Sequence, residues 1–267
     1  MEIRKADAGQ GWRWIAEGFG LFRKNPPIWI TLFVIYFLIV IVVSIVPVVG
    51  PLVMTLLAPV FTASFMLACR DVEAGEELEL GYLIAGFKHN TGQLITVGGL
   101  YLVGSITILG LMMMAGGGSI LGSAALGQMQ GAEPTEAAVG AMGGMLVALL
   151  VALALLVPLL MAYWFAPALV VLRNMTAMDA MKLSFVGCLR NMWPFLVYGV
   201  IAFILMMIAM IPFGLGMLIL VPVLNASIYL GYKDIFGNSD NSNSKENPEK
   251  DGLQIDTYHS NKDTPGE

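Results

Sequence analysis

The sequence predicts an all-α integral membrane protein of six transmembrane helices, arranged as three repeated hairpins that each follow a cytosolic interfacial amphipathic helix. Three observations predict this fold: an apolar composition, basic residues confined to one side of the predicted spans, and a pattern that recurs three times. The mean hydropathy is +0.78 over 267 residues. Only 12% of the residues are charged, against about 25% in soluble domains. We therefore expect the bilayer to be the solvent of this chain.

Six apolar runs are the candidate spans. The run at residues 28–46 contains fifteen Ile, Leu, Val or Phe and no charge, and each such side chain favours insertion by roughly 0.3 to 0.6 kcal/mol. The fourth run is longer than a hydrocarbon core of about 30 Å requires, so we expect it to tilt, to kink at Pro158 or to project beyond the bilayer. The other predicted spans, with the fourth included, are residues 52–69, 93–114, 140–172, 193–211 and 213–232.

The basic residues predict the orientation of these spans. All fourteen Lys and Arg fall before the first span, between spans two and three, between spans four and five, or after the sixth. By the positive-inside rule, both termini are then cytosolic. The predicted membrane domain covers residues 1–233. Residues 234–267 are rich in Asn, Ser, Asp and Lys, a composition that predicts a disordered cytosolic tail.

An internal repeat divides the membrane domain into three units, at about residues 9–71, 72–174 and 175–234. The units superpose on Asn25, Asn90 and Asn191, each of which is followed by a helix breaker and a span. The second spans also match. Residues 59–71 and 222–234 agree at seven of thirteen positions when Arg and Lys count as the same. The middle unit departs from this pattern because its proline moves to Pro167.

The segment before each hairpin has the spacing of an amphipathic helix. In the first, large apolar residues recur every three or four positions, and in the third Thr176 and Asp179 form a predicted N-terminal capping box. The expected apolar faces are Trp12, Ile15, Phe19 and Phe22; Leu80, Leu83, Ile84 and Phe87; and Met178, Met181, Phe185 and Leu189. These helices either serve as collars that set the angles of the spans or bind something at the membrane surface.

Two sets of residues are candidate sites. Lys24, His89 and Arg190 occupy equivalent repeat positions, so they could gather round a pseudo-threefold axis as a contact for phospholipid headgroups or for another membrane protein. Asn225 and Thr62, also equivalent, form a candidate intramembrane polar site because an amide needs hydrogen-bond partners in hydrocarbon. Interhelical hydrogen bonds that act only as packing contacts explain the second pair equally well.

A stripe of small residues and the residue inventory bear on partners and chemistry. Gly140, Gly144, Ala148 and Ala152 recur every four positions, which predicts a close helix contact within the chain or in an oligomer. The sequence contains two histidines and no G-x-S-x-G or H-E-x-x-H motif. We therefore expect no enzyme activity, metal or cofactor, and no nucleic-acid partner.

The N-terminal motif carries a resemblance. Residues 11–26 read GWRWIAEGFGLFRKNP and are followed by a long aliphatic span, which resembles a family of uncharacterised multi-span bacterial inner-membrane proteins that share a GWxWIxxGFxLFRKNP motif. The chain is more loosely similar to the membrane domain that precedes some glycerophosphodiester phosphodiesterases, although no catalytic domain follows here. The resemblance implies a multi-pass fold in the bacterial inner membrane and supplies no functional residue.

Two functions remain open at this stage. The first is a non-catalytic membrane module that binds a lipid or a partner protein through its surface helices. The alternative is a small-solute transporter that uses the proline-broken spans, which predicts a hydrated cavity among them.

Overall fold

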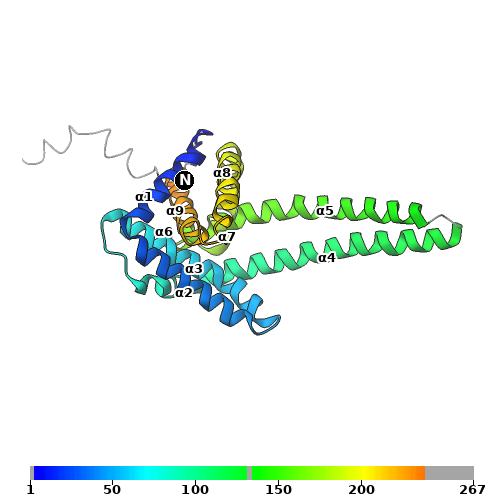
Figure 1. Cartoon of the computed structure of the whole chain (residues 1–267), viewed down its shortest axis with the longest axis horizontal. Coiled ribbons are helices and arrows are strands. Elements are labelled where there is room, and N and C mark those ends of the chain that lie inside the picture. Colours follow the sequence, from blue (N-terminus) through cyan, green and yellow to red (C-terminus); the bar gives the residue numbers. More distant parts are fainter. Residues whose placement is uncertain (1–2, 131–133, 238–267) are drawn as a thin grey trace, which may run out of the picture.

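The computed structural model describes residues 3–130 and 134–237, without the side chains of residues 115, 117–130, 134–138, 140 and 141. Its regular structure is entirely helical in these residues (Figure 1). The helices are α1 (Gln10–Lys24), α2 (Pro26–Ser44), α3 (Val49–Ala74), the 3-10 helix η1 (Leu80–Lys88), α4 (Thr91–Gln130), α5 (Pro134–Trp164), α6 (Ala166–Arg173), α7 (Ala177–Arg190), α8 (Met192–Met210) and α9 (Met217–Phe236).

Six helical stretches in the described residues are long and apolar enough to cross a membrane, which confirms the prediction of an all-helical chain with six candidate spans. They are Pro26–Ser44, Val49–Ala74, Thr91–Met114, Met142–Arg173, Met192–Met210 and Met217–Phe236. The spans form three pairs, which we call the first pair (α2 and α3), the second pair (α4 with α5 and α6) and the third pair (α8 and α9).

The second pair is longer than a bilayer requires. The helix α4 has 40 residues, so at about 1.5 Å per residue it is roughly twice as long as the hydrocarbon core is thick. Figure 1 shows α4 and α5 extending side by side far beyond the other helices. Pro158 lies inside α5 without ending it. The break falls at Phe165, between α5 and α6.

The helix before each pair packs on the pair that precedes it in the chain. The helix η1 lies against α3, and α7 lies against α5 and α6. The helix α1 has no earlier pair, and it packs instead on α9 and α8 of the third pair. The backbone N–H of Arg4 also donates to the carbonyl oxygen of Ile235 at 3.0 Å. The three units are therefore linked in a ring that the N-terminal segment closes.

The buried faces of these three preceding helices are richer in small residues than their sequence patterns suggested. On α1, Gly11, Trp14 and Gly18 are buried, whereas Trp12 and Phe19 are 50% and 45% exposed. The same holds for η1 and α7. Their predicted faces are divided. Leu83 and Met181 are buried, as are Ile15 and Phe22 on α1, whereas Leu80, Ile84, Phe87, Met178 and Leu189 remain exposed. The helix α7 also buries Ala177, Ala180, Ser184, Gly187 and Cys188.

Three local expectations can be compared with the structure. Thr176 caps α7, since its hydroxyl accepts a hydrogen bond from the Asp179 amide at 3.3 Å, as predicted. The segment before the second pair, η1, is a 3-10 helix rather than the expected α-helix. The tail was predicted to begin at residue 234, but α9 continues to Phe236, whose side chain is buried. The rest of the predicted tail, residues 238–267, lies outside the described residues.

A close approach between α1 and α8 yields a prediction. A Cβ atom on Gly11 would lie 2.3 Å from the backbone oxygen of Pro194, so we expect Gly11→Ala to lower the stability by about 1–3 kcal/mol, as overpacking does. Gly20→Ala is the matched control, because nothing lies within 4 Å of its Cβ position, and it should be neutral or stabilising by up to about 1 kcal/mol. Thermal unfolding of the purified protein in detergent measures both. Equal midpoints for the two variants would contradict this packing.

Candidate functional site

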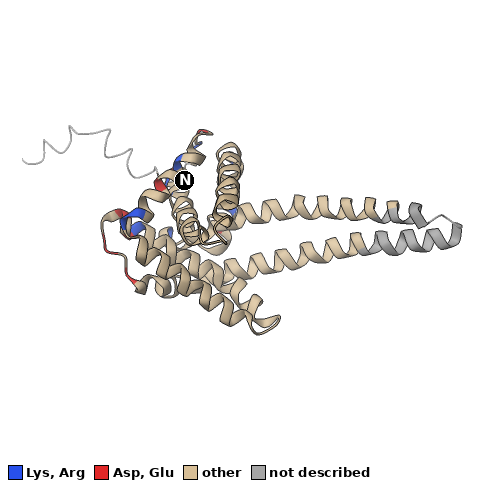
Figure 2. Cartoon of the chain, in the orientation of Figure 1, with Lys and Arg blue, Asp and Glu red and all other residues tan. Residues whose placement is uncertain are grey.

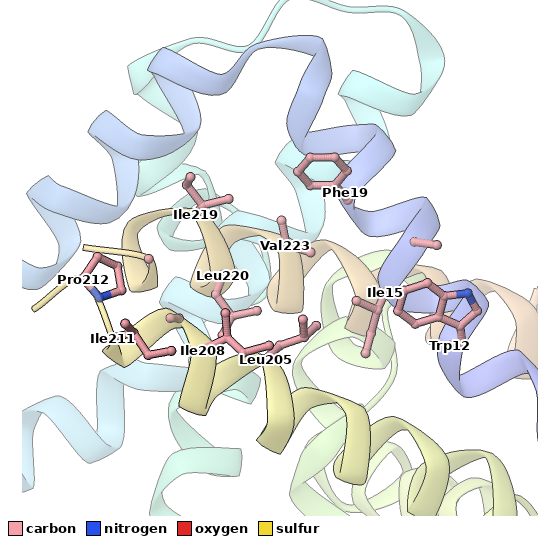
Figure 3. Close-up of a pocket in the computed structure, with 13 residues that line it drawn as sticks. Trp12, Ile15, Phe19, Leu205, Ile208, Ile211, Pro212, Ile219, Leu220 and Val223 are labelled. Carbon is pink, nitrogen blue, oxygen red and sulfur yellow. The ribbon is translucent and has the colours of Figure 1, made fainter. Parts of the chain in front are cut away.

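An apolar groove runs between α1 and the third pair (Figure 3). Its volume is about 690 Å³, which is within the range of roughly 300–1,000 Å³ that is usual for ligand pockets. Figure 3 shows Trp12, Ile15 and Phe19 along α1 on one side, with the C-terminal half of α8 and the N-terminal half of α9 on the other. The remaining walls are Ala16, Leu205, Ile208, Ala209, Ile211, Pro212, Gly216, Ile219, Leu220 and Val223. Since every lining side chain is apolar, the groove suits a hydrocarbon ligand.

The position of α1 depends on Gly18, which has no side chain and so allows the backbone of α1 to lie close to the backbone of α9. A Cβ atom on Gly18 would lie 2.8 Å from the carbonyl oxygen of Val223 and 2.9 Å from the amide nitrogen of Ser227. Trp14 anchors the same helix, because its indole Nε1 donates to Asp234 Oδ2 at 3.2 Å. The ring of Trp14 is 2% exposed. These contacts hold Trp12 and Phe19 at the edge of the groove.

The same contact recurs where η1 meets α3. A Cβ atom on Gly86 would lie 2.2 Å from the carbonyl oxygen of Val60, and the Gly86 amide donates to Ser64 Oγ at 2.8 Å. Val60 and Ser64 are the repeat equivalents of Val223 and Ser227. The helices α1 and η1 therefore pack on equivalent backbone positions, α1 on the third pair and η1 on the first pair.

The third docking uses a hydroxyl instead of a glycine. Ser184 of α7 accepts a hydrogen bond from the Phe165 amide at 3.0 Å and donates one to the Met161 carbonyl at 2.7 Å. Pro167 stands two residues after the break, where its missing N–H and its ring disfavour a continuous helix. Ser184 satisfies the backbone groups that flank this break. Ser184 has no sequence motif of its own that predicts this role. Its only signal is its place in the third amphipathic segment.

Charged residues gather at the ends of the helices in the compact part of the chain, away from the described portions of α4 and α5 that extend beyond it (Figure 2). Glu73 of α3 accepts hydrogen bonds from Tyr229 at 2.8 Å and from Lys233 at 2.7 Å. Arg4 pairs with Asp234 at 2.5 Å. Because these pairs are partly exposed, each contributes at most about 1 kcal/mol. The Glu73 contacts join the ends of the first and third pairs, and the Arg4 contact joins the N-terminal segment to the third pair.

The predicted headgroup residues do not meet one another. Lys24 donates to the carbonyl oxygen of Val72 at 2.8 Å, whereas His89 and Arg190 are exposed at the ends of η1 and α7. Among the described residues, no hydrogen bond or ion pair joins any two of the three. The prediction that they form one contact remains untested by this arrangement.

The candidate intramembrane pair is bonded locally. The Asn225 amide donates to the Val221 carbonyl at 3.1 Å, and the Thr62 hydroxyl donates to the Ala58 carbonyl at 2.9 Å. Both bonds stay within one helix and span four residues. The polar groups that link helices are instead the neighbouring serines. Ser64 contacts η1, and Ser227 lies 2.9 Å from the Tyr198 hydroxyl.

The repeated asparagines have structural contacts that the sequence did not reveal. Asn191 is 1% exposed and binds the N-terminal segment, since its Oδ1 accepts from the Ala6 amide at 2.8 Å and its Nδ2 donates to the Arg4 carbonyl at 3.1 Å. Asn90 has a positive φ of 51° and donates to Asn174 Oδ1 at 2.8 Å. Asn90 and Asn191 thus tie the junctions after η1 and after α7 to other segments of the chain.

The stripe of small residues on α5 faces α4 where the structure describes it. Ala148 is 1% exposed, and a Cβ atom on Gly116 of α4 would lie 3.8 Å from the Ala148 Cβ. Gly144 and Ala152 are half-buried, and the surroundings of Gly140 lie outside the description. A role for this stripe in an oligomer remains a prediction.

Metal ligands and nucleophiles are the groups in the described residues that could carry chemistry. They contain no group of three or more His, Cys, Asp or Glu that could hold a metal ion. Burial raises the pKa of the Cys188 thiol to about 12, so this thiol stays protonated at neutral pH and is a poor nucleophile. The arrangement is suited to holding an apolar ligand.

Comparison with known proteins places the chain in a family. Residues 13–243 match the family described as "Domain of unknown function (DUF7847)", and the chain belongs to this family. It is also 36% identical over 239 residues to a protein of Burkholderia thailandensis named "Probable inner membrane protein". That alignment covers 86% of this chain and 84% of the relative. No solved structure matches the chain.

The two asparagines yield a matched prediction. Asn191→Ala removes three hydrogen bonds from a buried site, so we expect a loss of about 1–3 kcal/mol and faster amide hydrogen exchange in residues 3–9. Asn225→Ala removes only a bond within its own helix, so it should cost less than about 1 kcal/mol. Thermal unfolding and hydrogen exchange in detergent measure the two effects. A larger effect at Asn225 would indicate that Asn225 has a partner that this structure lacks.

Proposed function

We propose that this protein is a non-catalytic, lipid-binding module of the bacterial inner membrane. Its three preceding helices lie at the cytosolic face, and both termini are cytosolic. Membership of the family and the name of the Burkholderia relative support the membrane. The confinement of all fourteen Lys and Arg to one side of the spans supports the orientation.

The large apolar side chains on the outward faces of α1, η1 and α7 support a contact between these helices and lipid. Trp12, Leu80 and Met178 are each about half exposed, although they belong to helices whose other faces are already packed. In water such a surface would be costly, whereas at the boundary of the bilayer it is favourable. The three helices would then be half in the protein and half in lipid.

The single observation that carries the proposal is the groove beside α1. Its walls are apolar, and it opens next to Trp12 and Phe19, which are aromatic residues of the kind that gather at membrane interfaces. The Arg23 guanidinium lies 5.8 Å from the centre of the Phe19 ring, where it can meet the phosphate of a lipid headgroup. The groove therefore suits one acyl chain of a phospholipid whose phosphate lies near Arg23.

Filling the groove tests this function. Ala16 lines the groove and is exposed, so Ala16→Phe should occupy the space of the acyl chain and weaken lipid retention about tenfold, which corresponds to roughly 1.4 kcal/mol. Native mass spectrometry measures the lipid that stays on the protein after purification from vesicles of phosphatidylglycerol and phosphatidylethanolamine. Gly20→Phe, on the same helix but with no atom within 4 Å of its Cβ position, is the control. If wild-type protein retains no lipid, or if both variants retain it equally, the proposal is wrong.

The orientation can be tested with reporters. We expect an alkaline phosphatase domain inserted between Pro47 and Val48 to be active, because it needs the oxidising side of the membrane. The same domain fused after Gly237 should be inactive, and a fluorescent protein fused there should fold in the cytosol. The opposite pattern of activities would reverse the proposed topology.

A further inference from the structure

The three pairs of spans meet one another in two equivalent contacts, and a third contact of the same kind is absent. The first helix of the second pair packs on the last helix of the first pair, as α4 packs on α3. In the same way, α2 packs on α9 of the third pair. The ring would be complete if α8 packed on α5, but these two helices do not pack in this way. A groove lies between them instead.

The helix break at Phe165 explains this open position. In the other two pairs the prolines, Pro59 and Pro222, stand inside continuous helices. In the second pair the proline is Pro167, and the helix is divided into α5 and α6. Because Ser184 satisfies the amide of Phe165 and the carbonyl of Met161, the break between α5 and α6 leaves no unpaired backbone group at these two positions. The gap beside α8 is thus part of the folded structure.

The chemistry of the gap fits a hydrocarbon chain. Its volume is about 500 Å³, and its walls come from α5, α8, α9 and the end of α7. Two polar side chains of its walls are engaged within the protein, since Cys188 Sγ donates a hydrogen bond to the Met161 carbonyl and the Tyr198 hydroxyl is hydrogen-bonded to Ser227.

The end of the gap that we place at the cytosolic face carries groups that suit a headgroup. Arg190 lies between two residues that line the gap, Cys188 and Met192. It is exposed and makes no hydrogen bond or ion pair with any described residue. Trp193 stands three residues after Arg190 and is 71% exposed, and Trp164 is one of the residues that line the gap. Exposed tryptophan and arginine side chains are typical of the level at which phosphates lie.

We propose that the opening between α5 and α8 is a second phospholipid site, which holds one acyl chain against α8 while the phosphate binds Arg190. The site rests on the proposed lipid-binding function and is separate from the groove beside α1. The bound chain takes the place of the helix contact that the other two positions of the ring possess. Arg190, one of the three residues singled out by the repeat, thereby acts at this site alone.

Two substitutions in the wall of the gap, with a matched control, test the site. Gly199 lines the gap, and nothing lies within 4 Å of its Cβ position, so Gly199→Phe can fill the gap without a clash. Ala202→Phe, on the same wall, guards against a variant that fails to fold. Gly110→Phe is the control, because it is equally open but lies on α4 outside the gap.

Native mass spectrometry of the full chain, purified from vesicles of phosphatidylglycerol and phosphatidylethanolamine, counts the lipids that remain bound. We expect Gly199→Phe and Ala202→Phe to hold one lipid fewer than wild type and than Gly110→Phe. Arg190→Gln should keep this lipid but lose the preference for phosphatidylglycerol over phosphatidylethanolamine by about tenfold.

The outcomes separate this site from the proposed function. If Ala16→Phe removes a lipid while Gly199→Phe and Ala202→Phe remove none, the second site is wrong and the lipid-binding function stands. If wild type holds no lipid, both are wrong. If the two wall variants instead abolish a dimer or a bound protein and leave the lipid count unchanged, the gap is a protein interface and the lipid assignment is overturned.

Discussion

The rest of this structure depends on how α1, η1 and α7 pack. Each of these helices lies against the backbone of a neighbouring pair of spans. Between helices in a bilayer, burial of apolar side chains contributes little because lipid is equally apolar, so close packing and hydrogen bonds must hold the helices together. Gly18 and Gly86 provide the close approach, on Val223 and Val60 respectively. With a Cβ atom at either glycine, the two backbones could not come so near.

The third docking differs from the other two, and the difference accounts for the open side of the ring. Ser184 replaces the glycine contact with two hydrogen bonds at the break that precedes Pro167. The Ser184 hydroxyl can form hydrogen bonds with the backbone groups that a helix break leaves unpaired. A glycine has no side chain that could form such bonds. In the second pair the helix is divided into α5 and α6, and α5 does not pack on α8. The second pair is thus both the irregular member of the repeat and one wall of the proposed second lipid site.

The sequence was sufficient for the six candidate spans and for the cap at Thr176, because both are read from local composition or spacing. It was sufficient for only part of the packed faces of α1, η1 and α7. Periodicity detects large apolar residues such as Phe19, whereas the packed faces are built around small residues such as Gly18. The repeat could not align these glycines, since Gly18 lies seven residues before Asn25 and Gly86 only four before Asn90. The groove beside α1 joins segments from the two ends of the domain, and no local pattern contains that contact.

The closure of the ring by the N-terminal segment is the central claim, and an engineered disulfide tests it most directly. Arg4 and Asp234 form an ion pair, and their backbones are close enough for a hydrogen bond between Arg4 and Ile235, so cysteines at positions 4 and 234 should meet the geometry of a disulfide. In a background without the two native cysteines, which are buried and unpaired, Arg4→Cys with Asp234→Cys should crosslink within one chain on mild oxidation. Asp71 is the repeat equivalent of Asp234 on the first pair. A crosslink between positions 4 and 71, with none between 4 and 234, would contradict the account.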